Sequence, residues 1–384
     1  MSGFAELWAE IAPVGRADSG GYLRFALTEP ELTLRDWFRG QAARRGMTVT
    51  DDGNGNLFAW RGEPWAPGTV LTGSHFDSVP HGGGYDGPLG IVSAFLAVDR
   101  VPADRKVGVA AFVEEEGARF GVPCLGSRLL TGVVDPARAA ALTDRDGVSF
   151  AEALGAPPAG RDERVTGLAA VVELHIEQGV ALQTPVGVAS AIWPHGRWRM
   201  DFAGVGDHAG TTRMTDRHDP MLTFAFTVLA ANKEARLSGA HATVGRVQVE
   251  PNATNAIPSL VRGWLDARAA DTATLDQLVD TVVKKATERA GRDGTTLEVT
   301  AESVTGEVAF QADLAQRISA LLGGAPILPT GAGHDAGVLS AHVPTAMLFV
   351  RNPTGVSHSP AEHASDADCE AGVEALARVL EDLT

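Results

Sequence analysis

The sequence predicts an α/β protein in which a mixed sheet covered by helices forms one domain and a ferredoxin-like α+β domain is inserted into it. Apolar, strand-like segments alternate with helical segments through the first half of the chain, which is typical of a sheet covered on both faces. The segment order then changes to βαββαβ, the order of a ferredoxin-like unit. We therefore expect one domain from residues 1–189 and 304–384, and an inserted domain from residues 190–303.

The first part of the chain contains helical patterns over residues 36–47 and 87–101. Strands are expected over residues 56–60, 68–75, 106–117 and 167–179, because these runs are apolar, and the last two end in acidic or other polar residues. The last three strands end at His75, Glu114–Glu116 and His175. Functional residues of such sheets gather at the carboxyl ends of strands, so these side chains are expected at one edge.

The inserted domain and the closing segment follow the same periodicity rules. Strands are expected over residues 197–205, 242–250, 259–269 and 295–304, and helices over residues 215–237 and 272–291. A further strand over residues 344–350 and a helix over residues 366–383 return the chain to α/β character. This return is the reason for placing the smaller domain inside the larger one.

Composition and charge narrow the class of protein. The chain has 384 residues, 44% of them hydrophobic, with a formal net charge of −16, which argues against nucleic acid or an anionic membrane as a partner. The N-terminus lacks a basic region followed by an apolar one, and no window approaches about 18 apolar residues. Cys124 and Cys369 are the only cysteines, too few for a disulfide framework. We expect a cytoplasmic protein.

The stretch "GSHFDSVPHGGGYDG", residues 73–87, combines five glycines with histidine and aspartate. Gly82, Gly84 and Gly87 form a literal G-x-G-x-x-G between a strand and a helix, which is the pattern of a dinucleotide-binding loop. Asp86 argues against that interpretation, because a carboxylate in the loop would repel the pyrophosphate that the helix N-terminus attracts. A metal site accounts for more of the residues.

In the metal interpretation, His75 is an imidazole ligand, and Asp77 accepts its other ring N–H and fixes the tautomer. Asp86 can bridge two cations, since a carboxylate has two oxygens. The run Glu114–Glu116 supplies one ligand and one base, and the remaining ligands are His175 and His363. Each feature alone is more often structural than functional, but together they match a site for two zinc or manganese ions about 3.5–4 Å apart.

Eight segments, in order along nearly the whole chain, resemble the hydantoinase/carbamoylase branch of the dinuclear-metal amidohydrolases, within the aminoacylase and carboxypeptidase G superfamily. The segments are "GSHFDSVPHGGGYDGPLG", "EEEGARFG", "LGSR", "ELHIEQG", "HAGTTRM", "PNATNAIP", "GAGHDAG" and "GVSHSPAEH". Of these, "EEEGARFG" and "ELHIEQG" are more specific to the branch than to the superfamily. The sequence departs from the expected pattern at Arg213, where we would expect proline, and at Phe76, where leucine is more usual.

The resemblance implies a role for each matching residue. The two metals would be held by His75, Asp86, Glu116, His175 and His363, with Asp86 bridging. Glu115 would be the general base, and Asp77 would orient His75. His208 would stabilise the developing oxyanion, while Gln178, Asn255 and Arg268 would hold polar groups of the substrate. The inserted domain would act as a lid and mediate homodimerisation.

The implied activity is hydrolysis of a ureido C–N bond in a small carboxylate substrate. Allantoate is the first expectation, and the alternatives are N-carbamoyl-L-amino acids and β-ureidopropionate-like compounds. A peptidase or deacylase is a more distant alternative, and so is a binding protein without catalysis. The sequence leaves the substrate side chain and the choice between zinc and manganese open, because His and carboxylate ligands suit both metals.

Overall fold

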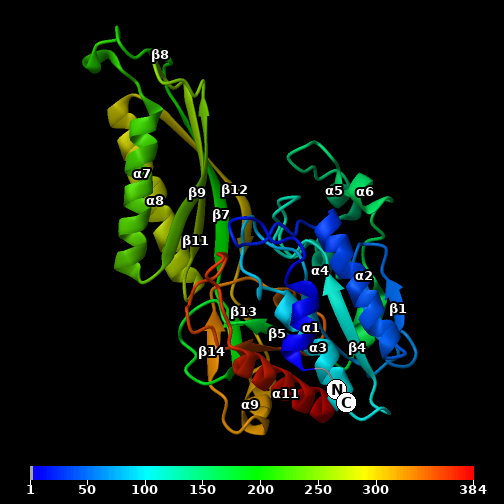
Figure 1. Ribbon diagram of the computed structural model, residues 1–384. Coiled ribbons are helices and arrows are strands. Elements are labelled where there is room, and N and C mark those ends of the chain that lie inside the picture. Colours follow the sequence, from blue (N-terminus) through cyan, green and yellow to red (C-terminus); the bar gives the residue numbers. More distant parts are fainter. Residues whose placement is uncertain (1–2) are drawn as a thin grey trace. The chain divides into compact units, whose positions relative to one another are not determined.

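The computed structural model describes residues 3–384 (Figure 1). The chain divides into two compact units, one formed by the chain up to Ala191 together with Ala309–Thr384, the other by Ile192–Val308. The sequence placed the boundaries of the inserted segment at residues 190 and 303, so its end differs by five residues. The difference arises because β12, the last strand of this unit, runs to Thr305, past residue 303.

The first unit is built on a nine-stranded mixed sheet. Its strands follow the order β1 (Thr48–Asp51), β2 (Leu57–Trp60), β4 (Val107–Phe112), β3 (Val70–His75), β5 (Ala170–Ile176), β15 (Thr345–Val350), β6 (Val186–Ile192) and β13 (Val308–Ala309), and β14 (Ile327–Thr330) pairs with β6. The four central strands, from β4 to β15, are parallel. The neighbouring β2 and β6 run antiparallel to them. Parallel neighbours bring their carboxyl ends to the same edge.

Both faces of the central strands of this sheet are buried, as the continuous apolar runs predict. Along β2 and β4, alternate residues enter two different apolar clusters: Leu57 and Val109 join one, Phe58 and Phe112 the other. The first cluster includes side chains of α3 and α11, which pack against each other. The helices of the unit are α1 (Phe4–Ile11), α2 (Glu29–Arg44), α3 (Pro88–Arg100), α4 (Leu125–Leu130), α5 (Pro136–Ala140), α6 (Phe150–Leu154), α9 (Ala312–Leu321), α10 (Asp335–Leu339) and α11 (Asp366–Leu383).

The second unit has the βαββαβ order expected from the sequence. Its antiparallel sheet has the strand order β12 (Thr296–Thr305), β7 (His195–Ala203), β11 (Leu260–Arg268) and β9 (His241–Glu250). The helices α7 (Pro220–Ser238) and α8 (Thr272–Asp293) lie beside each other on one face of it (Figure 1). A small ribbon of β8 (Asp207–His208) and β10 (Ala256–Ile257) extends from the sheet.

Alternation along β11 explains why the helices cover only one face. Val261, Leu265 and Ala267 are buried in the apolar cluster beneath the helices, while the alternate residues Arg262, Trp264 and Asp266 are only partly buried. Across residues 3–384, no helix combines the length and the apolar character needed to cross a membrane.

Candidate active site

The carboxyl ends of three neighbouring parallel strands carry the candidate site. His75 is the last residue of β3, His175 is the penultimate residue of β5, and Glu114–Glu116 follow β4. The loop after β4 is fixed by backbone hydrogen bonds, because Cys124 N–H donates to Glu115 O at 2.7 Å and Leu125 N–H to Glu114 O at 3.1 Å. The expectation that these residues meet at one edge of the sheet is confirmed.

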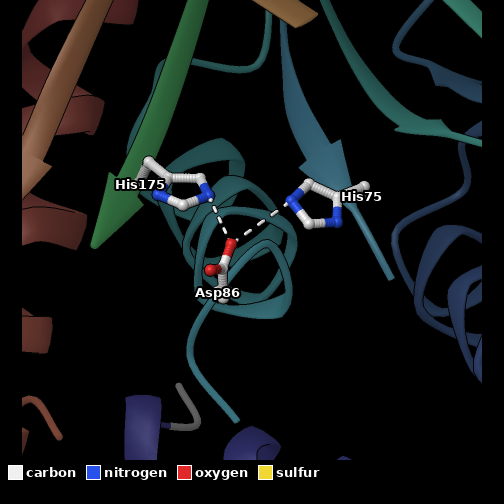
Figure 2. A group of neighbouring side chains, drawn as sticks. All are labelled: His75, Asp86 and His175. Carbon is white, nitrogen blue, oxygen red and sulfur yellow. Dashed lines mark ion pairs between the residues drawn. The ribbon is translucent and has the colours of Figure 1, made fainter. Parts of the chain in front are cut away.

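Asp86 reaches the same place from the glycine-rich loop between β3 and α3. Gly87, which follows it, has a φ of +85°, a conformation that favours glycine. A Cβ at Gly87 would also lie 2.5 Å from Cε1 of His75, so a larger residue would displace the imidazole. Figure 2 shows the result, with the Asp86 carboxylate lying between the rings of His75 and His175.

One oxygen of Asp86 faces a ring nitrogen from each histidine. Asp86 Oδ1 lies 3.1 Å from His175 Nε2 and 3.6 Å from His75 Nε2. The Nδ1 atoms point the other way, His75 Nδ1 to Asp77 O at 3.0 Å and His175 Nδ1 to Ile176 O at 2.9 Å. A backbone carbonyl accepts the proton of Nδ1, which leaves Nε2 of a neutral ring with its lone pair towards Asp86.

The two Nε2 atoms are buried and make no hydrogen bond within the described part of the chain. Lone pairs that converge on a carboxylate repel it, unless a cation lies among them or a ring is protonated. The same three side chains place their ligand atoms within 4.8 Å of one another. This donor set of two imidazoles and a carboxylate fits a divalent metal ion.

A second group of ligand atoms shares Asp86. It consists of Asp86, Glu116 and His358, again with ligand atoms within 4.8 Å of one another. His358 Nε2 lies 3.4 Å from Asp86 Oδ2 and 3.5 Å from Glu116 Oε2. The two oxygens of Asp86 thus face different groups, which is the arrangement that a carboxylate needs to bridge two ions.

The expectation for His363 needs a correction. His363 belongs to neither group of ligand atoms found among the described residues, and its ring packs edge-on against Tyr85, with centroids 5.9 Å apart. His358, five residues earlier in the same "GVSHSPAEH" segment, takes the expected place. The physical reason is the backbone: His358 has a φ of +55°, and this left-handed turn presents its ring to Asp86.

The expectation for Asp77 also changes in detail. The atom that accepts from His75 Nδ1 is the backbone oxygen of Asp77, whereas its carboxylate Oδ1 lies 3.7 Å away. The carboxylate instead accepts the backbone N–H groups of Glu115 and Glu116, at 3.2 and 3.1 Å. Asp77 therefore ties the end of β3 to the loop that carries both glutamates.

Electrostatics distinguish the carboxylates. Burial raises the pKa of Glu115 well above its ordinary value, and the charges of Glu116 and Asp335 raise it further. Burial and Asp86 raise the pKa of Glu116 to about 8. Although burial alone would raise the pKa of Asp86, the close approach of the His175 and His358 rings holds it well below its usual range. So many buried acids are unfavourable without positive charge nearby, and divalent cations supply that charge.

Glu115 lies beside the first group of ligand atoms without belonging to either. Its Oε2 lies 3.7 Å from His75 Nε2, and the thiol of Cys124 lies 3.6 Å from its Oε1. A carboxylate next to a metal site, but not needed as a ligand, is suited to moving a proton.

Gln178 contacts the carboxylate of Asp86 through Oδ2, the oxygen that faces the second group. Its Nε2 donates to Asp86 Oδ2 at 2.8 Å and to Ser357 Oγ at 3.1 Å. Its amide oxygen is buried and accepts no hydrogen bond within the described residues. Gln178 is therefore at the site, as expected, and one end of its amide is occupied by the bridging carboxylate.

The other expected substrate-binding residues belong to the second unit. His208 and Asn255 are exposed on the ribbon of β8 and β10, where Ala209 N–H donates to Asn255 O at 3.0 Å. Arg268 ends β11, and Asp266 accepts from its Nε at 2.9 Å and from one Nη at 3.3 Å. This pairing holds the plane of the guanidinium group in a fixed orientation.

A set of buried polar residues behind His175 was not assigned a role from the sequence. The ring of His334 lies 4.4 Å from that of His175, centroid to centroid. Next to it, Asp335 accepts a hydrogen bond from Ser127 Oγ at 2.5 Å, and Glu173 accepts from Ala336 N–H at 2.9 Å. The signal was present in the motifs "GAGHDAG" and "LGSR", but residue types alone do not show that the two segments meet.

Known proteins are similar to this chain along most of its length. The model of Peptidase family M20/M25/M40 matches residues 71–382. The N-carbamoyl-L-amino acid amidohydrolase of Geobacillus stearothermophilus is 37% identical over 398 residues, covering 96% of this chain and 94% of that protein. The allantoate amidohydrolase of Escherichia coli (strain K12) is 31% identical over 390 residues, covering 96% and 95% of the two chains.

A solved structure is similar over almost the whole chain. The hydantoinase/carbamoylase family amidase from Burkholderia vietnamiensis has a TM-score of 0.91 and 31% identity, covering 99% of this chain and 96% of that one. The extent of these matches includes every residue of both groups of ligand atoms. The chain therefore belongs to peptidase family M20/M25/M40, as a hydrolase of its hydantoinase/carbamoylase branch, whose enzymes act on C–N bonds other than peptide bonds.

Proposed function

We propose that the chain is a dinuclear-metal amidohydrolase that cleaves the ureido C–N bond of a small carboxylate substrate. The observation that carries this proposal is the pair of ligand groups that share Asp86, with Glu115 beside them. One ion would be held by His75, Asp86 and His175, and the other by Asp86, Glu116 and His358. His363, the sequence-based candidate, is replaced by His358 in this set.

Two divalent cations bound there would acidify a water molecule and polarise the substrate carbonyl. Glu115 would be placed to take a proton from the attacking water and to pass it to the leaving nitrogen. Asp77 keeps Glu115 in place through the backbone N–H that its carboxylate accepts.

Recognition of the substrate is assigned to four polar side chains. The amide oxygen of Gln178 is suited to accept from the terminal NH₂ of a ureido group. Arg268 offers a planar pair of donors to the substrate carboxylate. His208 stabilises the oxyanion, and a single such donor is typically worth about 2.7–4 kcal/mol. Asn255, next to β10, binds a further polar group.

Allantoate is the first candidate substrate, and N-carbamoyl-L-amino acids are the second. Both carry a ureido group and a carboxylate, which the proposed roles of Gln178 and Arg268 require. The second candidate is favoured by the 37% identity to an N-carbamoyl-L-amino acid amidohydrolase. The two candidate substrates differ in the part of the molecule beyond these shared groups, so specificity for one of them depends on how that part is bound.

The active molecule is proposed to be a homodimer formed through the second unit. Helix α7 exposes Leu222, Leu229 and Leu237, the last two each with 72% of their surface accessible. Spacings of seven and eight residues place the three leucines on one side of the helix. Strand β9, which packs near α7, lies at the edge of the sheet. An exposed apolar stripe beside a ten-residue edge strand is suited to a second copy of the chain.

A substrate panel tests the activity. Manganese-loaded and zinc-loaded protein is incubated with allantoate, N-carbamoyl-L-amino acids, N-carbamoyl-β-alanine, an N-acetyl amino acid and a dipeptide. Hydrolysis of a ureido group releases ammonia together with carbon dioxide and an amine, whereas deacylation and peptide cleavage release no ammonia. We expect ammonia from at least one ureido acid. Cleavage of only the acetylated compound or the dipeptide would identify a deacylase or peptidase, and no turnover of any compound would favour a binding protein.

A further inference from the structure

Glu362 connects the C-terminal segment of the first unit to the loop that carries Asp86. Its carboxylate Oε1 accepts the backbone N–H of Tyr85 at 2.9 Å and that of Asp86 at 3.0 Å. The residue is 5% exposed, so these hydrogen bonds are shielded from water. One side chain, more than 270 residues away in sequence, thus fixes the backbone position of the proposed bridging ligand.

The glycine-rich loop is shaped to receive this carboxylate. A Cβ at Gly83 would lie 2.2 Å from the carboxyl carbon of Glu362 and 2.6 Å from its Cβ. A residue with a side chain would therefore push the loop and Glu362 apart. The glycine at position 83 is explained by this close approach, because its own φ is not in the left-handed region.

The segment that carries Glu362 also carries His358 and Ser357. Ser357 Oγ lies 3.3 Å from Asp86 Oδ2, and His358 Nε2 lies 3.4 Å from the same atom. Asp86 and His358, which form the second group with Glu116, therefore lie on two different segments, and Glu362 joins these segments. Glu362 itself belongs to neither group of ligand atoms identified among residues 3–384.

We infer that Glu362 is a positioning residue for the second metal ion: it fixes the separation of Asp86 and His358 by accepting two backbone N–H groups. This inference rests on the proposed dinuclear centre. The role requires an oxygen acceptor at Oε1 and does not require a negative charge. A direct ligand would require the charge, so replacement by glutamine separates the two roles.

The experiment measures Mn²⁺ binding by titration calorimetry in the full-length protein, with near-UV circular dichroism to check the fold. The variants are Glu362→Ala, Glu362→Asp and Glu362→Gln. Ala removes the acceptor, Asp is too short by one methylene, and Gln keeps an oxygen that can accept both N–H groups. Glu31→Gln is the matched control, because Glu31 is buried and accepts Leu27 N–H at 3.0 Å, but belongs to neither group of ligand atoms among the described residues.

We expect Glu362→Ala and Glu362→Asp to weaken binding of the second ion by roughly 10- to 100-fold, the usual effect of losing a residue that supports a ligand. Glu362→Gln and Glu31→Gln should both bind two ions with an affinity within about threefold of the unaltered protein, a small change on that scale. If Glu362→Ala does not fold, Glu362→Asp provides the same comparison.

Two results would overturn the inference. Undiminished affinity in the Ala and Asp variants would show that Glu362 does not position the site. A loss in Glu362→Gln as large as that in Glu362→Ala would show that Glu362 is itself a ligand. If the unaltered protein binds no Mn²⁺, the proposed dinuclear centre fails instead, so the two failures are distinct.

Discussion

Glu115 and Glu116 are adjacent, yet they face different neighbours. Oε2 of Glu115 lies 3.7 Å from His75 Nε2, whereas Oε2 of Glu116 lies 3.5 Å from His358 Nε2. Of these two glutamates, only Glu116 belongs to a group of ligand atoms found among the described residues, the one that it forms with Asp86 and His358. The backbone N–H groups of both glutamates donate to the single carboxylate of Asp77, which holds the backbone from which the two side chains diverge.

We predict that Glu115→Gln keeps both metal ions and loses turnover by about 10²- to 10⁴-fold, the usual contribution of a general acid–base group. The amide is close in size to the carboxyl group but cannot take the proton. The measurement is kcat for a ureido acid together with metal content per chain. Glu116→Gln is the matched control and should lose the second ion. Normal turnover by Glu115→Gln would remove Glu115 from the mechanism.

A pair of histidine variants tests the ligand set. His358→Ala should lower the bound metal from two ions per chain to one, because His358 provides the imidazole of the second group. His363→Ala should bind both ions, since its ring packs against Tyr85. Elemental analysis after dialysis measures both. The reverse pattern, with metal lost only from His363→Ala, would restore the sequence-based assignment.

The sequence could not choose between these histidines. Both lie in "GVSHSPAEH", and both are of a type that binds metal. The choice depends on the left-handed backbone at His358 and on Glu362, whose carboxylate is turned towards the Asp86 loop. For Asp77, the residue was identified and the atom was not, because a backbone carbonyl next to His75 leaves no mark in the residue types.

At the scale of elements, strand β11 presents Arg268 at its end, next to Asp266 on the same side of the sheet. Asp266 holds two guanidinium nitrogens of Arg268, so the fork is oriented before a substrate arrives. Six residues earlier on the same strand, Arg262 pairs with Asp201 through Nε at 2.5 Å. The two arginines therefore differ in position along β11 but have similar partners.

We predict that Arg268→Ala raises KM for ureido acids by roughly ten- to a hundredfold, since a charge-assisted contact is worth about 1.5–3 kcal/mol. Arg268→Lys should restore only part of this, because an ammonium group lacks the planar fork. The measurement compares each acid with its amide, and Arg262→Ala is the control that should keep the preference for the acid. If Arg268→Ala keeps that preference and only lowers Tm, Arg268 is structural.

The exposed leucines of α7 give a test of assembly. We predict that the unaltered chain has twice the mass of one 40.1 kDa chain in solution, and that the double variant Leu229→Lys, Leu237→Lys is a monomer. Charged side chains on an interface that excludes water oppose association. Light scattering after size exclusion measures the mass. The control is Leu32→Lys on α2, which alters another exposed leucine. A double variant that remains dimeric would place the interface elsewhere.

The strand ends were predictable because two rules apply to them together. Apolar runs predict buried parallel strands, and parallel strands place their carboxyl ends at one edge, so His75, Glu116 and His175 were expected together. Short elements carried too little pattern: β14 has four residues, and β13 has two. Their pairing with β6 depends on segments far apart in the sequence, which periodicity does not report.

At the scale of the whole molecule, the buried acidic residues have a consequence that the net charge alone does not show. The net charge is −16, and some of the acids are inside the protein: Asp77, Asp86, Glu115 and Glu173 are each at most 6% exposed. Burying several carboxylates together is costly unless cations accompany them. The structure therefore supports a metal-dependent activity from two directions, the ligand geometry and the balance of buried charge.

The most direct test of this account is the metal content of the active protein. Chelator-treated protein, shown by elemental analysis to be metal-free, should release no ammonia from a ureido acid that the untreated protein hydrolyses. Addition of Mn²⁺ or Zn²⁺ should restore the activity, and the restored protein should contain two ions per chain, as the two ligand groups that share Asp86 require. Full ammonia release by the metal-free protein would contradict the account.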